Sequence, residues 1–284
     1  MSDAMPEVAD LGIHRAPIPD DAYCEGHPET PAIFRCAICR TLGCDECRWG
    51  KRGAREVCRD CAKDGLAQPI AWERRGEIGV VRGFIASVVE ILTSPTRFFR
   101  TPALEDDAVG GFEHGLVSFA VGQIALVLQG LVTIFLFGSA MVALTRVPEV
   151  AAVFGGYGCM LIALVPTMML HVPMTTLIAV GIASVAIHGT LRLLGAANAP
   201  FYAGTVRVTS YAFATHVLFI VPIVGFILAI VWTLILETIG IREVHRTTTL
   251  RAAIAVLGFR LALFVGALGL YAALVALTMR LASH

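Results

Sequence analysis

Long charge-free apolar runs fill the second part of the chain and are separated by short segments that carry arginine. Residues 115–145 and 150–191 contain no Asp, Glu, Lys or Arg, and Arg260 and Arg280 bracket a further run. A helix needs about twenty apolar residues to cross a hydrocarbon core of about 30 Å. The pattern therefore predicts an all-α polytopic membrane helix bundle of about five transmembrane helices.

The predicted spans are 115–145, 173–191, 208–221, 223–239 and 261–279. The run 150–191 could hold two crossings, but Pro166, His171 and Pro173 interrupt it in the middle. A single crossing there leaves nearly all loop arginines on the N-terminal side, as the positive-inside rule requires. We therefore expect five spans, a cytoplasmic N-terminus and an outer C-terminus, with 153–170 as an interfacial or half-inserted helix.

The segment before the first span has its own apolar periodicity. Within 77–92 the apolar residues recur every three or four positions, which predicts an amphipathic helix too short to cross the membrane. Pro95 should end it. Phe98 and Phe99 then stand between two arginines, a composition suited to the headgroup boundary, although a linker packed on the bundle would have the same sequence.

Composition agrees with a membrane protein that also has a polar N-terminal part. The chain of 284 residues is 56% hydrophobic and 15% charged, with a mean hydropathy of +0.74. Residues 1–21 are acidic and lack the apolar core of a secretory signal, so we expect the N-terminus to stay in the cytoplasm. Two lysines among 22 basic residues suggest a GC-rich genome, hence a bacterial inner membrane.

Basic residues gather next to the membrane. Residues 48–100 carry eleven Lys or Arg against six Asp or Glu. This surplus suits anionic lipid headgroups, and it is too small to predict nucleic-acid binding.

Seven of the eight cysteines lie between residues 23 and 62 and form, with one histidine, four pairs of two-residue spacing. The pairs are Cys24 with His27, Cys36 with Cys39, Cys44 with Cys47, and Cys58 with Cys61. Such pairs are typical zinc ligands, and two pairs complete one tetrahedral site. An odd cysteine count, a paired histidine and a cytoplasmic location argue against disulfides. We predict two Zn²⁺ ions, whose binding supplies most of the folding free energy of a segment that is poor in apolar residues.

The order of the pairs resembles B-box type zinc fingers, in which the first and third pairs bind one ion and the second and fourth the other. The resemblance implies the sites Cys24, His27, Cys44, Cys47 and Cys36, Cys39, Cys58, Cys61. The last pair departs from the B-box, where histidines are usual, and sequential pairing stays open. Either arrangement fills each site with protein ligands, so we expect a structural module that recognises a protein partner.

The membrane region resembles the Yip domain family of five-span proteins. The likeness is carried by 94–99, by 186–195, by 205–212 and by 220–241. Eukaryotic members bind Rab-type GTPases and act in Golgi and endoplasmic reticulum trafficking. For a bacterial chain the resemblance implies a membrane scaffold without that traffic.

The expected domains are a disordered tail at 1–22, the zinc module at 23–63, a linker with the interfacial helix at 64–112, and the Yip-like bundle at 113–281. The sequence has none of the motifs of a hydrolase, metalloprotease or phosphate loop, and Cys159 is an isolated thiol, so we expect no enzymatic activity. Ionisable residues within the spans are His171, His188, His216 and Glu237. The alternative is a small-solute or ion transporter, for which helix breaks at Pro166 and Pro173 would supply a midplane site.

Overall fold

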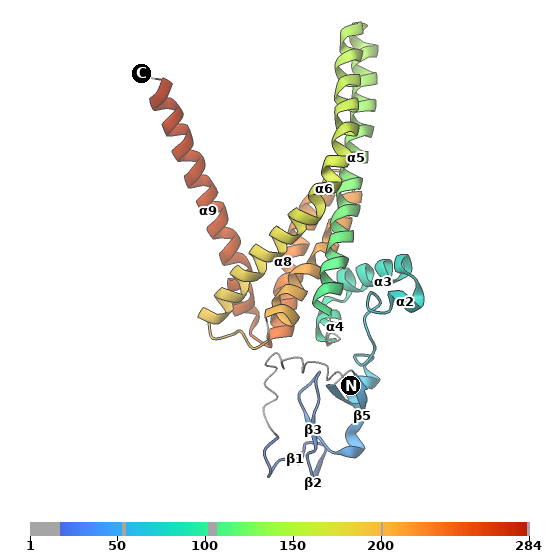
Figure 1. Ribbon diagram of the computed structural model, residues 1–284, viewed down its shortest axis with the longest axis vertical. Coiled ribbons are helices and arrows are strands. Elements are labelled where there is room, and N and C mark those ends of the chain that lie inside the picture. The colour runs from blue at the N-terminus through green and yellow to red at the C-terminus, as the bar shows by residue number, and fades with distance from the viewer. Residues whose placement is uncertain (1–17, 53–54, 102–106, 200, 283–284) are drawn as a thin grey trace, which may run out of the picture. The chain divides into compact units, whose positions relative to one another are not determined.

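The computed structural model describes residues 18–52, 55–101, 107–199 and 201–282, and the chain divides into two units, Met1–Gln68 and Pro69–His284. The first unit is small and rich in cysteine, and the second is helical (Figure 1). Four of the described helices are long and apolar enough to cross a membrane. The predicted fold class, a helical membrane protein with a small N-terminal Cys/His domain, is confirmed.

The N-terminal unit is built from two-stranded antiparallel hairpins. Its elements are β1 (Tyr23–Cys24) paired with β2 (His27–Pro31), β3 (Phe34–Arg35) with β4 (Leu42–Gly43), β5 (Arg48–Arg52) with β6 (Arg55–Cys58), the 3-10 helix η1 (Asp45–Cys47) and α1 (Arg59–Lys63). Its apolar core consists of Phe34, Ile38 and Val57 together with cysteines. Gly43 makes room for the ring, because a Cβ there would lie 2.5 Å from Cε1 of Phe34. So small a core needs further stabilisation to hold a fold.

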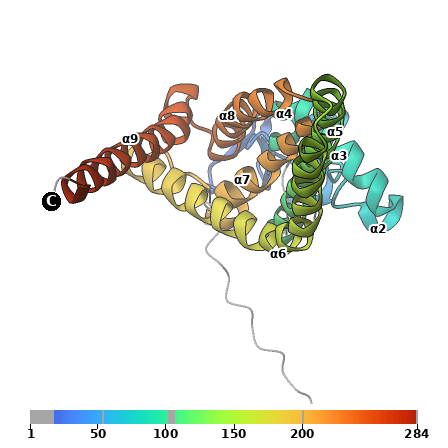
Figure 2. The same cartoon turned by 90° about the horizontal axis from the view of Figure 1, so that it is seen from above.

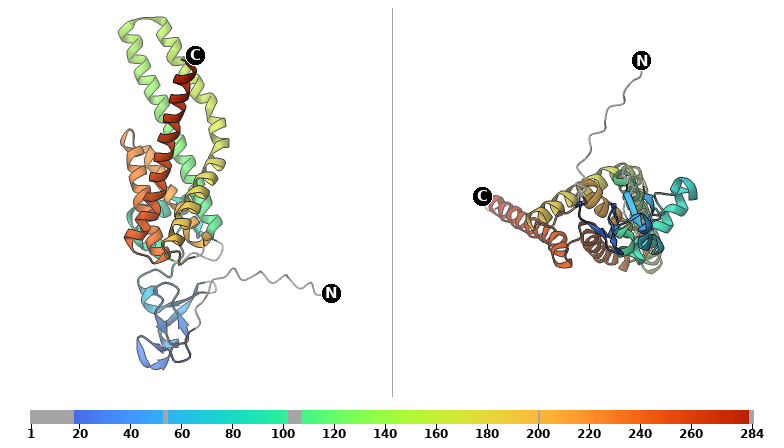
Figure 3. Two further views of the ribbon diagram at one scale, coloured as in Figure 1. Left: turned by 90° about the vertical axis from the view of Figure 1, so that its left-hand side faces the viewer. Right: turned by 90° about the horizontal axis from the view of Figure 1, so that it is seen from below.

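The C-terminal unit is helical in all its described regular elements. These are α2 (Arg75–Ile78), α3 (Val80–Thr93), α4 (Pro95–Arg100), α5 (Asp107–Thr145), α6 (Pro148–Leu193), the π-helix η2 (Phe201–Val206), α7 (Arg207–Ala212), the 3-10 helix η3 (Phe213–Ile220), α8 (Val224–His245) and α9 (Thr249–Ala282). α5 and α6 form a long antiparallel hairpin, and α9 runs from its contacts with α6 and α8 toward the same end as the tip of that hairpin (Figures 1 and 3). Seen from above, α8, α7 and α5 lie between α9 and α3 (Figure 2).

The third predicted span, 208–221, differs in the structure. The chain there forms α7 and then η3, which packs on α5 and α8 and leads back through a short turn into α8. All six residues of α7 are buried, including Arg207, Thr209 and Ser210. A segment that buries its polar side chains among neighbouring helices need not present the uniform apolar surface of a lipid-facing helix.

The stretch 153–170, predicted as an interfacial or half-inserted helix, is the first part of the continuous helix α6, and the part of α6 long and apolar enough to cross a membrane is Leu170–Leu193. Pro166 and Pro173 lie inside α6 without ending it. Side chains bond to main-chain carbonyls near both prolines: His171 Nδ1 lies 2.6 Å from the oxygen of Thr167, and the Thr175 hydroxyl donates to the oxygen of His171 at 2.7 Å.

The C-terminal unit has two layers. We call the layer that contains the C-terminal ends of α6 and α8 and the first turns of α5 and α9 the base. The base holds the buried core of the unit, including Ile187, Leu236 and Val256. Beyond it, the apolar part of α9 is exposed along its length, and Arg260 and Arg280 at its ends are about 30 Å apart at the rise of an α-helix. That distance matches a hydrocarbon core, so apolar exposure there is what lipid contact requires.

Phe98 and Phe99 do not face the headgroup boundary. They are 0% and 2% exposed and belong to the core of the base, where the Phe98 ring lies 5.0 Å from Tyr211. The prediction that this pair faces lipid is therefore wrong, and the linker packed on the bundle is what the structure shows. The predicted helix 77–92 is also divided, because Gly79 has a φ of +90° and separates α2 from α3.

Candidate metal centre

The cysteine and histidine side chains form two separate groups of four in the N-terminal unit. One group is Cys24, His27, Cys44 and Cys47, and the other is Cys36, Cys39, Cys58 and Cys61. In each group the four candidate ligand atoms lie within 4.8 Å of one another. The first pair thus meets the third and the second meets the fourth, in the crossed order that the resemblance implied. Sequential pairing, which spacing alone left open, is not the arrangement seen.

Contacts between strands produce this crossed order. The amide of Glu25, beside β1, donates to the carbonyl of Leu42 in β4 at 3.1 Å, which brings the Cys24 turn next to Cys44. The amide of Ala37 donates to the carbonyl of Glu56 in β6 at 2.9 Å, which brings the second pair next to the fourth. The two ligand pairs of each group therefore come from separate parts of the chain, and neither group forms from one local segment.

Distances within the first group match those of a tetrahedral zinc site. With metal bonds of about 2.3 Å to sulfur and 2.0–2.1 Å to nitrogen, a tetrahedron has edges of about 3.8 Å between sulfurs and about 3.6 Å between sulfur and nitrogen. The Sγ atoms of Cys24 and Cys47 are 3.6 Å apart. Nδ1 of His27 lies 3.3 Å from Sγ of Cys44, 3.4 Å from that of Cys47 and 3.8 Å from that of Cys24. These four distances are within about 0.3 Å of the edges that a zinc ion requires.

The second group has the same dimensions but lies in the apolar core of the unit. Sγ of Cys36 is 3.9 Å from that of Cys61, and Sγ of Cys39 is 3.6 Å from that of Cys58. Cys36, Cys58 and Cys61 belong to the buried cluster, whereas Cys39 is exposed. The amides of Ile38 and Cys58 each donate to Sγ of Cys36 at 3.4 Å, as they would to a metal-bound thiolate.

The electrostatics of both groups favour a cation. Hydrogen bonds to Cys44 and Cys24 raise the pKa of the His27 imidazole, so the surroundings of this ring attract positive charge. Burial raises the pKa of the Cys61 thiol, because a lone thiolate is poorly solvated there. A divalent ion removes that cost by pairing with the thiolates, and thiolate with imidazole is a donor set that zinc prefers.

Three of the four ionisable residues predicted within the spans have a polar partner inside the helix bundle. His188 Nδ1 lies 2.9 Å from the Thr205 hydroxyl, and Nδ1 of His216 lies 3.0 Å from the Phe213 carbonyl. Glu237 is 2% exposed and pairs with Arg260 of α9, not with Arg242 one turn along its own helix. The fourth, His171, is exposed on α6. These residues are dispersed and do not form one catalytic group.

Sequence reasoning did not predict the burial of three ionisable residues of the base, His114, Arg207 and His245. The amide of Ala199 donates to Nδ1 of His245 at 3.2 Å, and Nε2 of His245 lies 2.9 Å from the Thr205 hydroxyl. Because the Thr205 hydroxyl also contacts His188, the three side chains form a continuous chain of hydrogen bonds. Because the partners come from α6, η2 and α8, no local pattern could have shown it.

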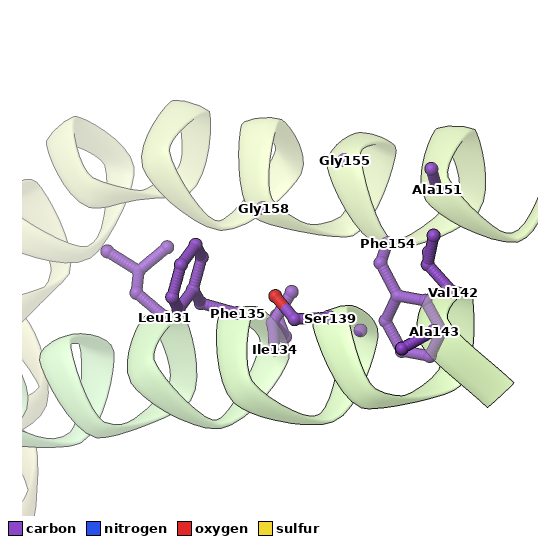
Figure 4. A pocket seen from close by; sticks show the side chains of 11 residues that line it. Leu131, Ile134, Phe135, Ser139, Val142, Ala143, Ala151, Phe154, Gly155 and Gly158 are labelled. Carbon is purple, nitrogen blue, oxygen red and sulfur yellow. The ribbon is translucent and has the colours of Figure 1, made fainter. Parts of the chain in front are cut away.

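A cavity of about 600 Å³ lies between α5 and α6, away from these groups (Figure 4). Its lining includes Leu131, Phe135 and Phe154 and has only one side chain with a polar atom, the hydroxyl of Ser139. It contains no acid, base or metal ligand and offers nothing for catalysis.

The Yip1 domain profile matches residues 89–271, most of the C-terminal unit. The chain belongs to the Yip1 domain family. The Yip1 domain includes the long helices and the hydrogen-bonded residues His188, Thr205 and His245 of the base. Both cysteine groups precede it in the sequence. No curated protein and no solved structure matches the sequence. The metal centre is therefore an addition to the Yip1 domain in this chain.

Proposed function

We propose that this Yip1 family protein is a membrane scaffold whose N-terminal unit holds two zinc ions and binds a protein partner. The observation that carries the proposal is the pair of four-ligand groups, each complete in protein atoms. A zinc ion with four protein ligands has no position for a reactive water and acts structurally. We therefore propose no enzymatic activity, and a recognition role for the surface that the ions stabilise.

Large side chains that could contact a partner project from this surface. Trp49, Tyr23 and Ile33 are 56%, 55% and 51% exposed. Irregular strand pairing occurs next to two of them, between Arg48 and Gly50 and between Tyr23 and Cys24. Bulges of this kind redirect side chains, and exposed tryptophan and tyrosine are frequent energetic centres of interfaces.

Charge favours a protein partner over anionic lipid headgroups. Five of the eleven basic residues in 48–100 form ion pairs within the chain, namely Arg48, Lys63, Arg74, Arg75 and Arg100. Residues 18–68 contain eight Lys or Arg against nine Asp or Glu. Seven zinc-bound thiolates would also outweigh the four positive charges of two ions. Attraction to an anionic surface should therefore be weak and easily screened by salt.

The helix breaks that supported the alternative function, a small-solute or ion transporter, are not present in α6. That alternative depended on broken helices at Pro166 and Pro173, and α6 is continuous through both. For orientation we propose a cytoplasmic N-terminal unit, and for location a bacterial inner membrane, supported by the arginine distribution and the scarcity of lysine.

A crosslinking capture from cells tests the proposal. The full chain is expressed as wild type, as Trp49→Ala and as the control Thr30→Ala, which alters an exposed residue of β2. We expect specific partner bands that Trp49→Ala weakens and Thr30→Ala retains, with unchanged zinc content in both variants. Equal capture by all three proteins would contradict a recognition role for this surface.

A further inference from the structure

Helix α3 has three distinct flanks. At about 100° per residue, Val81, Ile85 and Val89 fall within an arc of about 80°, and their exposures are 72%, 56% and 53%. Arg82, Ala86, Glu90 and Thr93 occupy a neighbouring arc of similar width. The third flank contains the buried residues Gly83, Ser87, Val88 and Ile91. A helix between protein and water alone would have no reason to keep a separate exposed flank of three branched apolar residues.

The buried flank attaches α3 firmly to the Yip1 domain. Val88 and Ile91 belong to the core of the base together with Phe98. The Ser87 hydroxyl lies 2.9 Å from Nε2 of His114 in α5. The helix lies across the direction of α5 (Figures 1 and 2). Its exposed flanks therefore have a fixed orientation relative to the spanning helices.

Two contacts place α3 at the boundary between the base and the layer beyond it. In that layer the helices α5, α8 and α9 carry no charged side chains, and we call it the charge-free layer. The Phe84 ring of α3 lies 5.2 Å from that of His114, which follows Glu113, the last charged residue of α5. On the other side, a Cβ at Gly240 of α8 would lie 3.2 Å from Phe99 of α4, the helix that follows α3. Gly240 is one turn from Glu237, which pairs with Arg260 at the start of the exposed part of α9.

The polar flank lies toward α4 and the charged end of the bundle. Burial raises the pKa of Glu90, while Arg97 of α4 lies close enough to oppose the shift. α4 itself packs beside the C-terminal end of α8, where Arg100 pairs with Glu243 at 2.7 Å. The apolar flank is thus on the side of α3 away from the charged end of the bundle.

We propose that the Val81–Ile85–Val89 flank of α3 inserts into the acyl chains of the leaflet on the base side, as a non-spanning anchor of the Yip1 domain. The occupant is lipid because the flank is apolar and lies at the boundary of the charge-free layer, next to spanning helices that are themselves exposed and apolar. Insertion of this flank depends on the membrane position of the Yip1 domain and not on the zinc module.

Photocrosslinking of the full chain in native membranes tests the insertion. The photoreactive residue p-benzoylphenylalanine replaces Ile85 in one protein and its neighbour Ala86, also exposed but on the polar flank, in another. Phe264, exposed on α9, serves as the positive control for lipid contact. We expect a phospholipid adduct at Ile85 with a yield close to that at Phe264 and several-fold above that at Ala86.

Other outcomes would overturn the proposal. An adduct from Ile85 to another polypeptide, or to residues 1–68 of this chain, would assign the flank to a protein contact. Equal lipid yields at Ile85 and Ala86, or no lipid at Ile85 while Phe264 reacts, would remove the oriented anchor. If the first pair fails to fold, Val81 and Arg82 provide the same comparison with the same criteria.

Discussion

Replacement of Thr205 by valine should destabilise the base of the Yip1 domain through the chain of hydrogen bonds that it interrupts. The amide of Ala199 donates to Nδ1 of His245, so a neutral His245 carries its proton on Nε2 and donates to the Thr205 oxygen. The threonine hydroxyl is then free to donate to Nδ1 of His188. One hydroxyl therefore satisfies two buried histidines, from α6 and α8.

The expected loss follows from the groups left without partners. Thr205→Val keeps the shape of the side chain but leaves Nε2 of His245 and Nδ1 of His188 unpaired, and these histidines are 0% and 6% exposed. An unsatisfied buried polar group costs about 1–3 kcal/mol, so the two together should lower the free energy of unfolding by about 2–6 kcal/mol.

Unfolding in mixed micelles of increasing SDS content measures this change. Thr176→Val is the matched control, because Thr176 is also 0% exposed and its hydroxyl donates to the Val172 carbonyl of its own helix, one turn away. The control should change the free energy of unfolding by less than about 0.5 kcal/mol, and Thr205→Ser should restore most of the loss. A Thr205→Val protein as stable as the control would refute the proposed hydrogen-bond chain.

Three further predictions concern other parts of the molecule. Cys24→Ser should weaken both zinc sites, because the pairs of the two groups alternate along the chain and each site holds segments that flank the other; metal analysis that finds one ion fully retained would mean that the sites fold separately. Reporter fusions after Leu66 and after His284 should report opposite sides of the membrane, and signals from the same side would require an even number of crossings. Gly240→Leu should destabilise the base by about 1–3 kcal/mol in the SDS assay, because even a Cβ would lie 2.6 Å from an α7 side chain, whereas Gly258→Leu, with open space around it, should not.

The long helices and the cysteine groups could be predicted because their signals are local. Lipid requires uninterrupted apolar runs, and α5 and α9 have them. Metal sites require closely spaced ligand pairs, and the two-residue spacings supply them. Which pairs meet could not be derived from spacing, because the bonds from Glu25 to Leu42 and from Ala37 to Glu56 join strands distant in sequence.

The failures share one physical cause, which is that an apolar residue buries equally well in protein or lipid. Phe98 and Phe99 have the composition of a headgroup boundary, yet they fill the core of the base. The apolar periodicity of 77–92 likewise combined two flanks, since Val88 faces protein and Val89 is exposed. The ion-pair partner of Glu237 comes from α9, so the sequence of α8 alone could not show it.

The zinc content of the intact protein tests the central claim most directly. The full chain is purified in mild detergent without chelator, dialysed against metal-free buffer, and analysed for zinc and protein by elemental mass spectrometry and amino-acid analysis. Two closed groups of four protein ligands predict two zinc ions per chain. One ion or none per chain in protein that remains folded would contradict the account.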